Sequence, residues 1–182
     1  DRLGQELPLA EAMSQHSEKN VYVYKNGSGA CPSLQQRESI CDRNPDSIDQ
    51  GHDYFVDNFL PCDAASIDWQ FYLHIQGESD CNFGFASSYY NNLKYKIEKI
   101  RLDINKADLI VIDYLLPHFN PYEDKDLINA AKEQYALEDN NFYVLTPPLT
   151  TTHPLNDDIH YDANGQEILA QHTFEFWRDN LI

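Results

Sequence analysis

The sequence is poor in basic residues. Against 13 Lys and Arg stand 30 Asp and Glu, so the 182-residue chain carries a formal net charge of −17 at pH 7. A surface with this excess of negative charge repels phosphate groups, which argues against nucleic acid and anionic membranes as partners. The sequence also lacks an apolar run of about 18 residues, the length that a membrane span needs, so we expect no membrane insertion.

Internal repeats, low-complexity segments and a basic-then-apolar leader are absent as well. Hydrophobic residues make up 42% and aromatic residues 13% of the chain, which excludes a disordered protein and suits one domain over residues 1–182. Residues 32–66 are polar and contain cysteines, and we expect them to form an irregular insert. Because the chain begins at Asp1 and not at methionine, we expect that a signal or an upstream segment has been removed.

The cysteines show no C-x-x-C pair, so a zinc site is not indicated. In an oxidising compartment they could form two disulfides, and three pairings are possible. Buried free thiols are the alternative. We expect an extracellular or secreted protein with disulfides. The four cysteines all lie in the first half of the chain: Cys31, Cys41, Cys62 and Cys81.

Strand and helix signals alternate along the chain. Continuous apolar runs such as "ADLIVIDYLLP" are typical of parallel strands that are covered on both faces. Amphipathic spacing predicts the helices, most clearly where Tyr89, Leu93 and Ile97 share one face. The same spacing predicts that a later helix buries a face formed by Leu127, Ile128, Ala131 and Tyr135. The expected strands are residues 21–25, 69–75, 108–116 and 142–146, and the expected helices are residues 6–16, 87–104, 126–137 and 163–177.

This alternation predicts an α/β fold with one parallel sheet, right-handed crossovers and helices on both faces. In such sheets the ligand lies beyond the carboxyl ends of the strands. Three polar segments are then expected to face one crevice: "NGSGA" (26–30), "QGESD" (76–80) and "HPLNDDIH" (153–160).

The third of these segments places Asp157 three residues before His160. A catalytic histidine needs a carboxylate that fixes its tautomer and stabilises the imidazolium, and this spacing can supply the pair from one turn. Two alternatives stay open. The segment can be a solvated acidic turn in which Asp162 or Asn164 caps the last helix. It can also be a metal site formed by His153, Asp157 and His160.

The other two segments offer hydrogen-bond donors. The side-chain amide of Gln76 can donate to a developing oxyanion, and a backbone N–H at Gly27 or Gly29 can do the same. The structural alternative is that the carboxylates of Glu78 and Asp80 stabilise the next helix at its amino-terminal end, where the helix dipole is positive, and that the glycines form an ordinary turn.

Taken together, these motifs resemble those of the SGNH hydrolases, and within them the sialate O-acetylesterase-like carbohydrate esterases. "HIQGESD" (74–80) is similar to the W-x-Q-G-E-x-D block of that family, with His74 in the place of tryptophan. "DDIH" (157–160) is similar to D-G-x-H, with Asp158 in the place of glycine. "GQELPLA" (4–10) resembles the family's G-P-E-L-P-L-A stretch, and "YKNGSGA" (24–30) its glycine-rich block.

The resemblance implies a flavodoxin-like three-layer sandwich and a cofactor-free serine hydrolase that removes acetyl groups from carbohydrates. It implies that Asp157 and His160 belong to a Ser-His-Asp triad. Gln76 and Gly29 or Gly27 would then form the oxyanion hole. The remaining carboxylates of "QGESD", Glu78 and Asp80, would brace the loop.

The family's nucleophile lies in a G-Q-S-N block that precedes the stretch matched by residues 4–10, and neither that serine nor its strand is present here. We therefore expect the first strand and the nucleophile upstream of Asp1 or on a second chain. Ser28 is the weak fallback, since its loop belongs to the oxyanion hole by resemblance. A catalytically silent module that binds glycans or serves a structural role is the alternative function.

Overall fold

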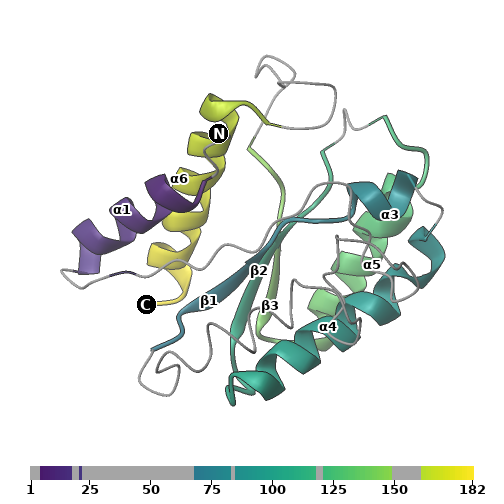
Figure 1. The fold of residues 1–182 in the computed structure, drawn as a ribbon, viewed down its shortest axis with the longest axis horizontal. Coiled ribbons are helices and arrows are strands. Elements are labelled where there is room, and N and C mark those ends of the chain that lie inside the picture. The colour runs from purple at the N-terminus through teal and green to yellow at the C-terminus, as the bar shows by residue number, and fades with distance from the viewer. Residues whose placement is uncertain (1–4, 18–20, 22–67, 83–84, 118–120, 149–160) are drawn as a thin grey trace. The chain divides into compact units, whose positions relative to one another are not determined.

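The structure is a computed structural model, and the residues that it describes are 5–17, 21, 68–82, 85–117, 121–148 and 161–182. Figure 1 shows the course of the chain. The chain divides into two compact units, which are described separately. Unit 1 comprises Asp1–Lys25, Pro117–Pro121 and Pro147–Ile182, and unit 2 comprises Asn26–Leu116 and Tyr122–Thr146. The predicted insert at 32–66 and the predicted strand at 21–25, apart from Val21, lie outside the described residues.

Unit 2 contains a parallel sheet with strand order β1-β2-β3. Its strands are β1 (Phe71–His74), β2 (Ile110–Tyr114) and β3 (Phe142–Leu145). Leu73 pairs with Ile112, and Ile112 pairs in turn with Tyr143. The three strands predicted at 69–75, 108–116 and 142–146 and their parallel pairing are confirmed. The fold is therefore α/β, of the flavodoxin-like type.

The helices of unit 2 are α3 (Glu78–Asn82), the 3₁₀ turn η3 (Ala86–Ser88), α4 (Tyr89–Asp103) and α5 (Lys125–Glu138). They lie on one side of the sheet (Figure 1). This follows from the strand order, because two right-handed crossovers that advance in one direction place their helices on the same face. Helices on both faces, as the sequence predicts, are therefore not provided by unit 2 alone.

The core of unit 2 lies between this helical layer and the sheet. Tyr89, Leu93 and Ile97 of α4 are almost fully buried, as their helical spacing predicts. The prediction that Leu127 belongs to the buried face of α5 is wrong, since this side chain is 56% exposed. The buried face of α5 is instead formed by Ile128, Ala131, Lys132 and Tyr135.

Unit 1 contains α1 (Glu6–Ser17) and α6 (Ala163–Asn180), which pack against each other. His16 contacts the rings of Phe174 and Trp177 edge-on. Asp162 caps α6, because its carboxylate accepts a hydrogen bond of 2.8 Å from the backbone N–H of Gly165. Asp162 thus has the capping role that the sequence offers as an alternative for this region. None of the described helices has the length and apolar character to cross a membrane.

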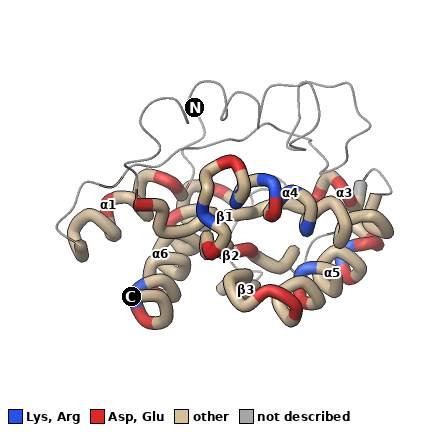
Figure 2. Tube along the Cα trace, turned by 90° about the horizontal axis from the view of Figure 1, so that it is seen from below, with Lys and Arg blue, Asp and Glu red and all other residues tan. Residues whose placement is uncertain are grey.

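Helix α4 concentrates positive charge in an otherwise acidic chain (Figure 2). Its basic residues are Lys94, Lys96, Lys99 and Arg101.

Arg101 has a structural role at the amino-terminal edge of the sheet. Its guanidinium donates to the carbonyl oxygen of Leu109 from Nε (3.1 Å) and from Nη2 (2.8 Å), and Nη1 pairs with Asp139. This one side chain ties the last turn of α4 to the residues just before β2 and β3. Burial raises the pKa of Asp139, but hydrogen bonds from Arg101 and Asn141 outweigh it and hold the pKa below its usual value.

Replacing Arg101 with methionine is expected to lower the free energy of unfolding by about 1.5–3 kcal/mol, because charge-assisted hydrogen bonds in a largely buried place are lost. Urea denaturation of the two proteins measures the difference. Lys94→Met is the matched control, since Lys94 forms an exposed pair with Glu138 at 3.7 Å and such pairs contribute about 0–1 kcal/mol. Equal losses in both variants would contradict the structural role of Arg101.

Candidate functional site

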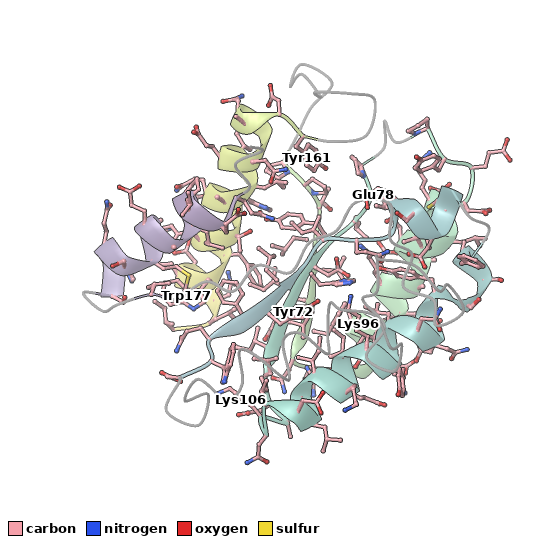
Figure 3. The ribbon with its side chains drawn as sticks, in the orientation of Figure 1. Tyr72, Glu78, Lys96, Lys106, Tyr161 and Trp177 are labelled. Atoms are coloured by element: carbon pink, nitrogen blue, oxygen red, sulfur yellow. The ribbon has the colours of Figure 1, made fainter. Side chains whose placement is uncertain are left out.

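Gln76, Glu78 and Asp80 are the predicted site residues that the structure describes. They follow β1 directly, at the carboxyl end of the sheet, as the sequence predicts. Glu78 begins α3 and is partly buried (Figure 3). The other predicted site residues lie outside the described residues: Gly27, Ser28, Gly29, His153, Asp157 and His160.

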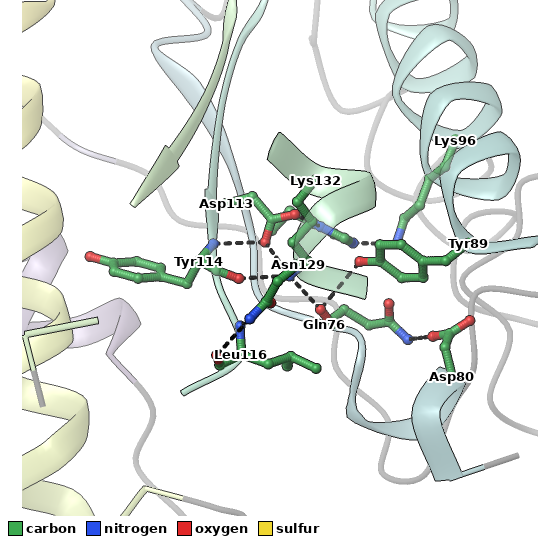
Figure 4. Close-up of polar contacts among 10 residues, drawn as sticks. Gln76, Asp80, Tyr89, Lys96, Asp113, Tyr114, Leu116, Asn129 and Lys132 are labelled. Carbon is green, nitrogen blue, oxygen red and sulfur yellow. Dashed lines mark hydrogen bonds and ion pairs between the residues drawn. The ribbon is translucent and has the colours of Figure 1, made fainter. Parts of the chain in front are cut away.

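Gln76 is buried, with 3% of its surface exposed, and its side chain is fixed by Asp80. The Nε2 atom of Gln76 donates to Oδ2 of Asp80 at 2.5 Å (Figure 4). A side-chain amide has two N–H donors, so this bond uses one of them and sets the plane of the amide. Asp80 is fully buried and therefore holds the amide from within the protein.

Gly77 shapes the turn between Gln76 and α3. Its φ angle is +135°, a conformation that residues with a side chain rarely adopt. A Cβ atom at this position would lie 2.8 Å from Cγ2 of Ile128, so the close packing of α5 also requires glycine. The glycine of "QGESD" thus allows a sharp change of direction between the end of β1 and the start of α3.

The backbone carbonyl oxygen of Gln76 accepts two hydrogen bonds from side chains of different helices. Nζ of Lys132, from α5, donates to it at 2.7 Å, and the hydroxyl of Tyr89, from α4, donates at 3.2 Å (Figure 4). Both side chains are fully buried. Burial raises the pKa of Tyr89 well above its usual value, so its hydroxyl keeps the proton that it donates.

The ammonium group of Lys132 is held at the end of β2 as well. It donates to Oδ1 of Asp113 at 2.9 Å and to the carbonyl oxygen of Tyr114 at 2.6 Å. With the bond to Gln76, three acceptors match the three N–H groups of an ammonium ion. Burial raises the pKa of Asp113, but Lys132 and His74 outweigh it and keep the pKa below its usual value. Asp113 is therefore an ionised carboxylate inside the protein.

His74 lies on the other side of the same carboxylate. Its Nδ1 atom is 2.9 Å from Oδ2 of Asp113, and its Nε2 atom is 3.2 Å from Nζ of Lys96. An ionised carboxylate only accepts and an ammonium group only donates, so His74 carries its proton on Nδ1 and is neutral. Burial, followed by the charge of Lys96, lowers the pKa of His74 to about 4, although Asp113 acts in the opposite direction.

The tip of β2 is also attached to α5 by Asn129. Its side-chain amide donates to the carbonyl oxygen of Leu116 at 3.0 Å and accepts from the N–H of Leu116 at 2.7 Å (Figure 4). Side chains of α5 thus bind the residues that follow β1 and the residues that follow β2. The carboxyl end of this sheet is therefore held by a buried network of donors and acceptors in fixed positions.

Cys81, which follows the "QGESD" segment directly, is not a candidate nucleophile. Burial, and then the carboxylate of Asp80, raise the pKa of the Cys81 thiol to about 12, so this buried free cysteine is not a reactive thiolate at neutral pH. Among the described residues there is no cluster of His, Cys, Asp and Glu that could hold a metal ion. Because Cys81 is free, the expectation that the four cysteines form two disulfides is wrong. A single disulfide among Cys31, Cys41 and Cys62 stays a prediction, since these cysteines lie outside the described residues.

Sequence reasoning missed the buried charges of Lys96, Asp113 and Lys132. Two signals could have indicated them. Asp113 interrupts the apolar run "ADLIVIDYLLP", and a carboxylate inside a buried strand requires a partner. Lys132 lies four residues after Ile128 and three before Tyr135, on the apolar face of its helix.

Replacing His74 with glutamine is expected to remove one component of the pH dependence of stability. The unfolded chain protonates His74 near pH 6.5, whereas the folded protein resists protonation down to about pH 4. The free energy of unfolding therefore falls between these pH values as the pH is lowered, by an amount on the order of 3 kcal/mol for this one group. Glutamine can still donate to Asp113 and accept from Lys96, but it does not titrate.

Urea denaturation at pH 7, 6, 5 and 4 measures this component as the difference between the two proteins. The stability of the wild type should fall more steeply than that of His74→Gln. Parallel curves would contradict the assignment of a neutral, buried His74.

Comparisons with known proteins identify the family and the fold of the chain. The model of one protein family, described as carbohydrate esterase, sialic acid-specific acetylesterase, matches residues 62–177, which is more than half of the chain. A search of curated proteins finds no match. Among solved structures, a protein from Arabidopsis thaliana, determined by X-ray diffraction at 1.6 Å resolution, is similar with a TM-score of 0.76 and 19% identity, over 99% of this chain and 70% of that one. At this identity the likeness shows the fold, and the family model shows the family. The chain belongs to the sialic acid-specific acetylesterase family of carbohydrate esterases.

Proposed function

We propose that this protein is a serine-dependent acetylesterase that removes acetyl groups from carbohydrates. The observation that carries the proposal is the buried Gln76, which stands at the tip of β1 with its side chain held by Asp80. The family description supports acetylesterase chemistry on a carbohydrate in general. An acidic surface is compatible with a neutral or cationic substrate and disfavours a strongly anionic one.

The proposed mechanism proceeds through a covalent acyl-enzyme. A serine hydroxyl attacks the acetyl carbonyl, while His160 accepts the hydroxyl proton and Asp157 fixes the histidine tautomer. His160 then gives this proton to the sugar oxygen as its bond to the acetyl carbon breaks, and the sugar leaves with a free hydroxyl. His160 next takes a proton from a water molecule, which attacks the acetyl-serine ester. As the bond from the acetyl carbon to the serine oxygen breaks, His160 returns the proton to the serine, and acetate leaves. No cofactor is needed for either half of the reaction.

In this mechanism Gln76 donates a hydrogen bond to the oxyanion of each tetrahedral intermediate, together with a backbone N–H of Gly29 or Gly27. A donor contributes most to catalysis when its position is fixed before the reaction begins. Asp80 provides that fixation for Gln76, because a buried carboxylate accepts one of the two amide protons. Glu78 is assigned to the support of the same loop.

The nucleophile is proposed to precede Asp1. In the family's block order the serine block comes before the stretch that residues 4–10 match, so the chain offers no better candidate than Ser28 within its own glycine-rich loop. A segment of the same polypeptide or a second chain could carry the serine. We also propose a secreted location, on the basis of the cysteines.

The first test uses the protein with its natural sequence upstream of Asp1. It should hydrolyse p-nitrophenyl acetate and acetylated sugars, and the sequence 1–182 alone should be nearly inert. His160→Ala should abolish turnover, and Asp157→Asn should lower kcat by about 10³–10⁴-fold because the histidine tautomer is no longer fixed. Asp158→Asn is the control and should retain activity. If the natural protein cleaves no ester, the silent-module alternative is correct.

The second test concerns the oxyanion donor. Gln76→Ala is expected to lower kcat by about 10–10³-fold with little change in KM, because the lost hydrogen bond matters most in the transition state. Steady-state kinetics of the same ester measure both constants. Gln70→Ala, which removes an exposed glutamine just before β1, is the matched control and should behave like the wild type. An equal kcat in all three proteins would exclude Gln76 from the oxyanion hole.

A further inference from the structure

The carbonyl oxygen of Gln76 is unusual in the number and origin of its donors. Gln76 lies two residues beyond the last residue of β1, where the ladder with β2 has ended. A buried carbonyl group outside a ladder still requires a hydrogen-bond donor. Here two are supplied, by Lys132 of α5 at 2.7 Å and by Tyr89 of α4 at 3.2 Å.

Both donors are themselves held in place by the surrounding structure. Lys132 is bound at the same time to Asp113 and to the carbonyl oxygen of Tyr114, so its ammonium group is fixed to the end of β2. Tyr89 belongs to the first turn of α4 and its ring is fully buried. Hydrogen bonds therefore fix the position of the Gln76 peptide relative to the sheet, to α4 and to α5.

The residue that follows Gln76 makes such an anchor necessary. Gly77, with φ of +135°, is intrinsically the most permissive type of residue in the chain, and its peptide with Gln76 can rotate at low cost if nothing holds it. Rotation of this peptide would displace the side chain of Gln76. A displacement of about 1 Å is enough to lose a large part of the effect of a catalytic group.

We propose that Lys132 and Tyr89 are positioning residues. They hold the side-chain amide of Gln76 where it can donate a hydrogen bond to the oxyanion. The inference rests on the proposed function, because it assigns these residues to the oxyanion hole of the same site. Neither residue touches the substrate. Both act through the carbonyl group of Gln76, while Asp80 acts on its side chain.

A merely structural role for Lys132 predicts a different result. A buried ion pair that only supports the fold lowers stability when it is broken, and the molecules that remain folded keep their kcat. A positioning role lowers kcat in the folded protein. It also makes the loss depend on Gln76, because a side chain that acts through Gln76 has no further effect once that amide has been removed.

The test is a double-mutant cycle in the protein with its natural upstream sequence. Lys132→Met should lower kcat for p-nitrophenyl acetate by about 10–10²-fold, and Tyr89→Phe, which removes one hydroxyl, by about 3–10-fold. KM should stay within about threefold in both. In the Gln76→Ala background, either change should alter kcat by less than about threefold. Lys99→Met, which breaks a partly buried pair on α4, is the control and should keep the wild-type kcat.

Each outcome is decisive. If Lys132→Met does not fold at the assay temperature, Tyr89→Phe carries the test, since the phenylalanine ring keeps the packing of the tyrosine. Additive losses in the Gln76→Ala background, or a wild-type kcat in folded Tyr89→Phe, would overturn the positioning role while leaving the esterase intact. A wild-type protein that cleaves no ester would overturn the proposed function itself, and with it the catalytic meaning of the anchor.

Discussion

The pair formed by Asp113 and Lys132 is the interaction on which the rest of unit 2 depends. Both side chains are fully buried, and their contact of 2.9 Å compensates each charge with the other. Loss of one partner would leave an unpaired charge inside the protein, a change that typically costs about 3–5 kcal/mol. The remaining bonds of the ammonium group go to carbonyl oxygens beyond β1 and at the end of β2. One ion pair therefore holds together the edge where the site lies.

This arrangement explains how a short motif is held in one conformation. In "QGESD" the glycine provides the turn, Asp80 fixes the amide of Gln76, and side chains of α4 and α5 fix its carbonyl group. His74, which stands where the family has tryptophan, completes the network by donating to Asp113. The groups of the motif have fixed positions because residues from distant parts of the sequence bind them.

Much of this architecture could be predicted from the sequence. The apolar runs and the helical spacing of Tyr89, Leu93 and Ile97 identify the elements, since burial of one face is a local property of sequence. The partners of Asp113 could not be predicted, because His74 comes from β1 and Lys132 from α5, on either side of it in sequence, and only the packed fold brings them together. The helical spacing allows both Leu127 and Ile128 on the buried face of α5, and the packing of the fold buries only Ile128.

The central proposal is that a serine outside residues 1–182 acts with His160 to cleave an ester. Gln76 donates a hydrogen bond to the oxyanion that forms in this reaction. Mass spectrometry of the protein with its natural upstream sequence, after reaction with a fluorophosphonate, tests it most directly. The account predicts one covalent adduct, on a serine that precedes Asp1, and no adduct in His160→Ala, because an activated hydroxyl is required. An adduct on Ser28, or a protein that stays unmodified while it hydrolyses esters, would contradict the account.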